Sequence, residues 1–298
     1  SMKRYLYLMA MFGLAACASV DGGSSGTETA ARGVPVGGWL AGDGRPIEAA
    51  ALFDRAHAVD FVLLGETHDR AAHHLWKAEV IAELRARRPE LAVGLEMLPR
   101  RAQGALDRYV ADAVDQAGFL EESAWKESWG FDFALYRPIF AYAREHGIPL
   151  IALNVDRSLV REVGQEGFDA VAARTEMPVG RPADPMPGYV SHLAEVYAAH
   201  ADGRTPAADD PAFRRFVDAQ LLWDRAMAEA LAQAHDAGGR LVVGVMGAGH
   251  VENGYGVPHQ LAALGKLGVL TLLPWDAERS CGDLSPHLAD AVYGIGTD

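Results

Sequence analysis

The chain has 298 residues and half of them are hydrophobic, which is enough to bury a sizeable core, so a disordered chain or a fibrous repeat is excluded. The formal net charge is −13 at pH 7 and the short arginine runs form no basic stripe, so we expect no nucleic-acid partner. Only two cysteines occur, and if Cys17 is lipidated then Cys281 stands alone and no disulfide can form within the chain.

The N-terminus has the pattern of a secretory signal. Lys3 and Arg4 precede an apolar run over 5–16 that is too short to cross a bilayer as a helix. The sequence Leu14-Ala15-Ala16-Cys17 resembles the bacterial lipobox, in which small residues precede a cysteine that receives lipid. We therefore expect residues 1–16 to be a signal peptide and Cys17 to be acylated. The alternative is an ordinary secretion signal with an incidental cysteine.

The segment that follows the cysteine predicts a tether. Residues 17–38 are rich in Gly, Ser, Thr and Ala, which is typical of a flexible linker that holds a domain away from the membrane. Ala18 stands where an aspartate commonly retains lipoproteins in the inner membrane of enteric bacteria. We expect a protein anchored to the outer membrane and facing the periplasm.

Residues 39–298 are expected to form a single α/β domain. Short apolar runs without polar alternation predict strands that are covered on both faces, at 61–64, 91–95, 149–153, 241–246 and 269–273. Helical spacing lies between them, at 73–88, 99–113, 133–146, 211–235 and 257–267. Strands that alternate with helices predict a mostly parallel sheet flanked by helices.

One region interrupts this alternation. Residues 157–210 contain four closely spaced prolines and read as an insertion, with a helix expected at about 188–200. Insertions of this kind often form a lid or a partner surface.

Polar residues stand just past four of the five predicted strands. Glu66 and His68 follow the first strand, Glu96 the second, Asn154 the third and His250 the fourth. The carboxyl ends of parallel strands share one edge of the sheet, where ligand crevices form. We therefore predict that these side chains meet in one site.

Two carboxylates and two imidazoles that converge support two kinds of chemistry. Glu66, His68, Glu96 and His250 could act as general acids and bases, with Asn154 and His73 in support, or could bind a divalent metal ion through mixed nitrogen and oxygen ligands. Within residues 39–298 there is no G-x-S-x-G elbow, P-loop or H-E-x-x-H motif, which disfavours a serine-hydrolase triad, a nucleotide kinase and a zincin.

Several motifs in order along the chain resemble the ChaN-like haem-binding lipoproteins. They are Leu64-Gly65-Glu66-Thr67-His68-Asp69, Gly94-Leu95-Glu96-Met97, Ile151-Ala152-Leu153-Asn154, Gln220-Leu221-Leu222-Trp223-Asp224 and Gly249-His250-Val251. The opening motif also looks like the wider group that holds the erythromycin esterases and the Tiki-type metalloproteases. The narrow resemblance implies haem binding at a homodimer interface in bacterial haem and iron uptake, and the wider one implies a hydrolase. Whether the chain is an enzyme stays open.

Haem requires an apolar slot and an axial ligand. On the predicted helix of the insertion, Tyr189 and His192 share one face and are the candidate haem ligands, with Tyr197 and His200 further along. Aromatic residues that could line the slot are Trp125, Trp129 and Phe131. We expect the haem ligands and the strand-end residues to form two sites that respond independently to mutation.

Overall fold

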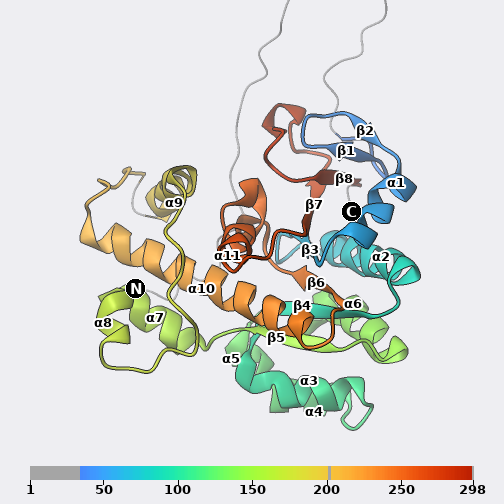
Figure 1. Cartoon of the computed structure of the whole chain (residues 1–298), viewed down its shortest axis with the longest axis horizontal. Helices are drawn as coiled ribbons and strands as arrows, with labels where there is room; N and C mark the ends of the chain where they lie inside the picture. The colour runs from blue at the N-terminus through green and yellow to red at the C-terminus, as the bar shows by residue number, and fades with distance from the viewer. Residues whose placement is uncertain (1–33, 201–202, 297–298) are drawn as a thin grey trace, which may run out of the picture.

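The computed structural model describes residues 34–200 and 203–296 (Figure 1). Its centre is one eight-stranded sheet in the order β2-β1-β8-β7-β3-β6-β4-β5. The strands are β1 Trp39–Ala41, β2 Pro46–Ile47, β3 Phe61–Leu64, β4 Leu91–Pro99, β5 Leu150–Asn154, β6 Leu241–Val245, β7 Val269–Asp276 and β8 Ala291–Ile295. β1 pairs antiparallel with β2 and β8, and every other pairing is parallel. The predicted α/β class with a mostly parallel sheet is confirmed.

Helices cover both faces of this sheet (Figure 1). They are α1 Ala49–Asp54, α2 Ala71–Arg87, α3 Gln103–Val110, α4 Gln116–Glu122, α5 Trp125–Ser128, α6 Phe133–His146, α7 Arg157–Glu166, α8 Phe168–Ala172, α9 Pro187–His200, α10 Pro211–Asp236 and α11 Val257–Ala263. Short 3-10 turns include η3 Arg100–Ala102 and η4 Ala248–His250. The five predicted strands and the predicted helices are all present.

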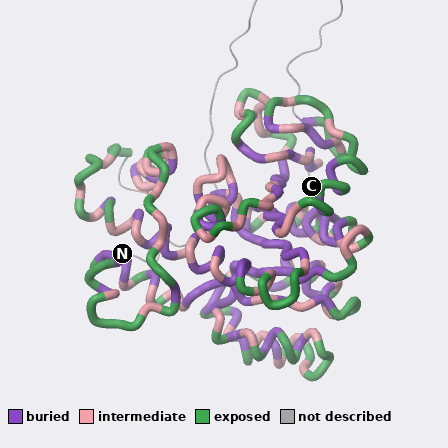
Figure 2. Tube along the Cα trace, in the orientation of Figure 1, coloured by how far each residue is buried: buried purple, intermediate pink, exposed green. Residues whose placement is uncertain are grey.

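The alternation of side chains along β3 shows how the two faces are filled. Val62 and Leu64 pack in the core beneath α2, α3 and α6, whereas Phe61 and Leu63 pack in the core beneath α10 and α11. Successive strand residues point to opposite faces, and all four are fully buried, so β3 lacks a polar face. Figure 2 shows the same burial along the central strands, with exposed residues on the outer turns.

The interrupted region consists of three helices at one end of the sheet. α7 and α8 share an apolar core with α10, and α9 packs Tyr189 and Leu193 against Phe213, Val217 and Leu221 of α10. The predicted helix at 188–200 is therefore observed as α9. The sequence did not predict α7 and α8 as helices.

The expectations for residues 1–33 lie outside the part of the chain that the structure describes. The last five residues of the expected tether are described and belong to the domain, because Val34 is buried in the core and Gly37 N donates to the carbonyl oxygen of Gly294 at 2.9 Å. Residues 1–16 and Cys17 belong to the undescribed range. Within the described residues, no helix has both the length and the apolar character needed to span a bilayer.

Candidate functional site

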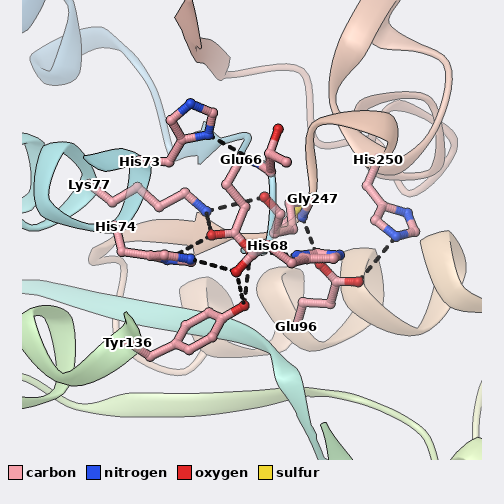
Figure 3. A network of polar contacts seen from close by, with 11 residues as sticks. Glu66, His68, His73, His74, Lys77, Glu96, Tyr136, Gly247 and His250 are labelled. Carbon is pink, nitrogen blue, oxygen red and sulfur yellow. Dashed lines mark hydrogen bonds and ion pairs between the residues drawn. The ribbon is translucent and has the colours of Figure 1, made fainter. Parts of the chain in front are cut away.

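The carboxyl ends of β3, β6, β4 and β5, which are neighbours in the sheet, border a cleft of about 220 Å³. Four residues line this cleft: His68 from the loop after β3, His250 from η4 after β6, Asn154 from the last residue of β5, and Glu96 from within β4, which runs on to Pro99. Glu66 is buried and contacts the His68 ring from behind (Figure 3). The structure thus brings together the residues that the strand-end argument placed in one site.

Glu66 is the centre of a buried group of charges. Its Oε1 lies 2.6 Å from His68 Nδ1, and its Oε2 lies 2.8 Å from His74 Nδ1 and 3.1 Å from Lys77 Nζ (Figure 3). The Tyr136 hydroxyl donates to Oε1 at 3.4 Å. Burial alone would raise the pKa of Glu66, but the charges of Lys77 and His74 outweigh it and hold the pKa well below its usual range. Glu66 is therefore a carboxylate.

This carboxylate sets the orientation of the His68 ring. A carboxylate can only accept, so His68 donates from Nδ1, and Nε2 carries the lone pair in the neutral ring. Trp129 packs edge-on against the ring at 4.7 Å between centroids, and Phe131 packs at 5.4 Å. A Cβ atom on Gly247 would lie 2.9 Å from His68 Cε1, so this position requires glycine. The arrangement presents a basic nitrogen on a fixed ring.

His250 stands between two carboxylates. Its Nδ1 lies 2.6 Å from Asp224 Oδ1 and its Nε2 lies 3.3 Å from Glu96 Oε1, so both nitrogens act as donors. Burial would lower the pKa of His250, but Glu96 and Asp224 outweigh it and raise the pKa to about 10. Burial likewise opposes ionisation of Glu96, yet His250 lowers its pKa to about 2. At neutral pH the pair is an imidazolium beside a carboxylate.

The other oxygens of Glu96 and Asp224 are also engaged. Gly247 N donates to Glu96 Oε2 at 2.7 Å, and the Tyr189 hydroxyl donates to Asp224 Oδ2 at 2.7 Å. Tyr189 is fully buried and does not line the cleft. Burial, and then the charge of Asp224, raise the pKa of Tyr189 well above its usual value. Tyr189 therefore supports His250 through Asp224.

The two supporting residues of the prediction hold loops in place. His73 Nδ1 accepts from Thr67 N at 3.0 Å, and its Nε2 lies 2.9 Å from Asp276 Oδ1. This fixes the loop that carries Glu66 and His68. Asn154 Nδ2 donates to the carbonyl oxygen of Glu96 at 3.1 Å.

The remaining candidates divide between the cleft and the core. Trp129 lines the cleft, whereas Trp125 is buried and donates from Nε1 to the carbonyl oxygen of Phe131 at 2.8 Å. His192 is half-buried on α9 and does not line the cleft. Of the insertion's residues on α9, Val196 and His200 line it.

Sequence reasoning did not assign a role to His74, Lys77 or Asp224. His74 and Lys77 lie three residues apart on α2 and both are fully buried, so a helical face that points toward the strand ends was their only signal. Asp224 is a fully buried acid within an apolar stretch of α10, and such an acid requires a partner.

A preformed metal centre is not evident in the described residues. No three His, Cys, Asp or Glu side chains in this part of the chain are placed to share an ion. Lys77 and His250 instead neutralise Glu66 and Glu96. Mixed-ligand metal binding through Glu66, His68, Glu96 and His250 therefore stays a prediction.

Comparisons with known proteins give the same fold. A family model described as haem-binding uptake, Tiki superfamily, ChaN, matches residues 52–261. ChaN of Campylobacter jejuni, whose structure describes cofacial haem binding, has a TM-score of 0.67 at 16% identity and covers 86% of this chain and 95% of its own. An erythromycin esterase mutant in its open conformation has a TM-score of 0.47 at 14% identity, over 76% of this chain and 72% of its own, which is too weak a likeness for any inference.

One curated relative is also similar. The chloroplastic Protein RETICULATA-RELATED 5 of Arabidopsis thaliana is 25% identical over 203 residues. The match takes in 62% of this chain and 26% of that protein, so the chain spans about a quarter of the relative's length.

Proposed function

We propose that this chain, which belongs to the ChaN family of haem-binding uptake proteins in the Tiki superfamily, is a lipid-anchored protein that holds haem during bacterial iron acquisition. The observation that carries the proposal is the family match over residues 52–261, a range that contains the cleft and all of the insertion.

The size of the cleft supports haem that lies partly outside it. Pockets that enclose a drug-sized ligand measure roughly 300–1,000 Å³, and this cleft measures about 220 Å³. A porphyrin would therefore rest at the mouth, where Val196, Phe216 and Trp223 offer apolar surface. A face left uncovered in this way would be covered by a second copy, which supports the expected homodimer.

His200 is a third candidate ligand beside the two expected from the sequence. His200 lines the cleft, and its Nδ1 donates to the carbonyl oxygen of Val196 at 2.6 Å, which leaves the lone pair of the neutral ring on Nε2. Nε2 is itself buried, so the ring has to move before this nitrogen can reach iron. Tyr189 would have to release Asp224 and ionise against a raised pKa before it could bind ferric iron. Tyr189 and His192 remain untested as ligands.

Haemin titration of the purified protein tests the proposal. We expect a shifted Soret band together with dimerisation measured by sedimentation. His200→Ala should weaken haemin binding and alter the spectrum. The matched control is His57→Ala, which removes an exposed histidine outside the cleft and should bind as the wild type does. A Soret band that never moves would refute haem binding.

The lipid anchor is tested separately. Cys17→Ser should release the protein from membranes and leave the domain folded, because the lipobox directs the first lipid to the cysteine thiol. We expect the wild type in the outer-membrane fraction and the variant in the periplasmic fraction. A variant that still sediments with membranes would contradict the anchor.

A second candidate function, hydrolysis, is favoured by the two oriented histidines. His68 lines the cleft with its Nδ1 bonded to Glu66, so Nε2 of the neutral ring could accept a proton, and His250 is an imidazolium that could donate one. Water could lose a proton to His68 as it attacks an ester carbonyl, and His250 could protonate the leaving oxygen. Cleavage of p-nitrophenyl esters that is lost in His68→Ala, with haemin binding retained, would establish this activity. No cleavage above that of His68→Ala would exclude it for these esters.

A further inference from the structure

One buried amide oxygen in the cleft has no hydrogen-bond partner among the described residues. Gln220 of α10 lines the cleft and is only 5% exposed. Its side-chain oxygen makes no hydrogen bond with the described residues. A buried polar group without a partner is uncommon because it loses its hydration without compensation. Gln220 therefore points to a polar group on a ligand.

The first turn of α7 borders the same cleft. Asp156, Arg157 and Ser158 all line it, and Asp156 is the residue before the first turn. Its side chain makes no capping bond to the helix, and Arg101 Nε instead donates to Asp156 Oδ1 at 2.5 Å. The first amides of α7 therefore keep the positive end of the helix without a side-chain cap, which favours a bound anion.

The charges at the rim of the cleft sum to a positive value. Arg157 and Arg161 lie one turn apart on α7 and line the cleft. The carboxylates on this rim are Glu127 and Asp156, and Asp156 is paired with Arg101. Deeper in the cleft the charge of Glu96 is offset by His250. The balance at the rim is thus positive in a protein whose net charge is −13.

We propose that the uncapped amides of α7, Gln220, Arg157 and Arg161 form a carboxylate subsite. Rotation of the Gln220 amide by 180° about χ3 exchanges the positions of its oxygen and its NH₂ group. The NH₂ group can then donate a hydrogen bond to a carboxylate that lies beside the α7 amides. The identity of the ligand rests on the proposed function: if the protein binds haem, the carboxylate that enters this subsite is a haem propionate. The cleft then receives the propionate while the porphyrin stays at its mouth.

The experiment compares haemin with haemin dimethyl ester, in which both propionates are masked. The wild type should bind haemin about ten- to a hundredfold more tightly than the ester, since a charge-assisted bond to a carboxylate is lost. Gln220→Leu should reduce this preference about three- to tenfold and leave the affinity for the ester unchanged. Arg161→Gln should act in the same direction.

Stability separates this role from a structural one. Gln220→Leu removes a buried amide oxygen that has no partner and puts an apolar side chain of similar size in its place, so the variant should be as stable as the wild type or more stable. Matched controls are Gln233→Leu, an exposed position of the same helix, and Arg214→Gln, an exposed arginine outside the cleft. Equal affinity for haemin and its ester, or a preference that Gln220→Leu leaves intact, would overturn the proposal.

A further experiment tests the carboxylate subsite if the protein does not bind haem. If neither haemin nor its ester binds, the proposed function is wrong, and 3-phenylpropionate and 3-phenylpropionamide then probe the subsite directly. Amide shifts in the first turn of α7 that appear with the acid and not with the amide would support the subsite. Shifts with neither compound, or equal shifts with both, would refute it.

Discussion

Removal of the His250 charge tests the electrostatics of the site. The pKa of His250 is raised from 6.5 to about 10, so the native state holds the proton more tightly than the unfolded state does. The stability from this proton is fully present below the unfolded pKa and is lost as pH rises from about 6.5 through 10. At 1.36 kcal/mol per pKa unit, the His250 contribution falls by about 3 kcal/mol between pH 6 and pH 9. Glu96 adds no slope there, because its pKa of about 2 keeps it ionised.

Urea unfolding of the wild type and of His250→Gln at the two pH values measures this fall. The variant should be less stable at pH 6, and the difference between the two proteins should shrink by about 3 kcal/mol at pH 9. His146→Gln, which removes an exposed histidine at the end of α6, should keep the wild-type pH dependence. If His250→Gln does not fold, NMR titration of the wild-type ring replaces it. A constant difference, or a ring that titrates near 6.5, would refute the reasoning.

Two other substitutions test the packing and the charges of the site. Gly247→Ala places a methyl group against His68 and should destabilise the protein by about 1–3 kcal/mol. The control is Gly104→Ala in α3, where the added methyl group has open space and should be neutral or stabilising by up to about 1 kcal/mol. Equal urea midpoints for the two variants would argue against the close approach of Gly247 to His68. Lys77→Met leaves Glu66 without its buried cation and should destabilise the protein by about 3–5 kcal/mol. The control is Lys126→Met, which removes an exposed lysine and should change the stability by less than about 0.5 kcal/mol. A small loss of stability for Lys77→Met would mean that Glu66 is protonated.

The central strands were predictable because they consist almost entirely of apolar residues, which indicates burial on both faces. The run at 61–64 is apolar at every position, and the structure places β3 in the middle of the sheet. β1 and β2 have three residues and two residues, too few for any periodicity to be recognised. β8 includes Gly294, and a glycine is disfavoured within strands. The antiparallel edge of the sheet was missed for these reasons.

The candidate site was predictable where polar residues follow strands, and hidden where they lie within helices. Glu66 and His68 stand in the loop after β3 and His250 in the 3-10 turn η4 after β6, so the topology of a parallel sheet brings them to one edge. Lys77 and Asp224 lie on helices, where a charged residue ordinarily faces solvent. Their burial depends on how α2 and α10 pack against the strand ends. The spacing of residue types along the sequence does not reveal that packing.

The contact between Tyr189 and Asp224 changes how the cleft and the insertion are related. We expected the residues of α9 and the strand-end residues to respond independently, as distant sites without shared partners do. Tyr189 and His250 instead share Asp224: the Tyr189 hydroxyl lies 2.7 Å from Asp224 Oδ2, and His250 Nδ1 lies 2.6 Å from Asp224 Oδ1. The two sets of residues therefore have a common partner, and the expectation of independent responses loses its basis. Any movement of α9 that withdraws the Tyr189 hydroxyl leaves one oxygen of a buried carboxylate without a donor. The position of α9 and the protonation of His250 are therefore linked through the carboxylate of Asp224.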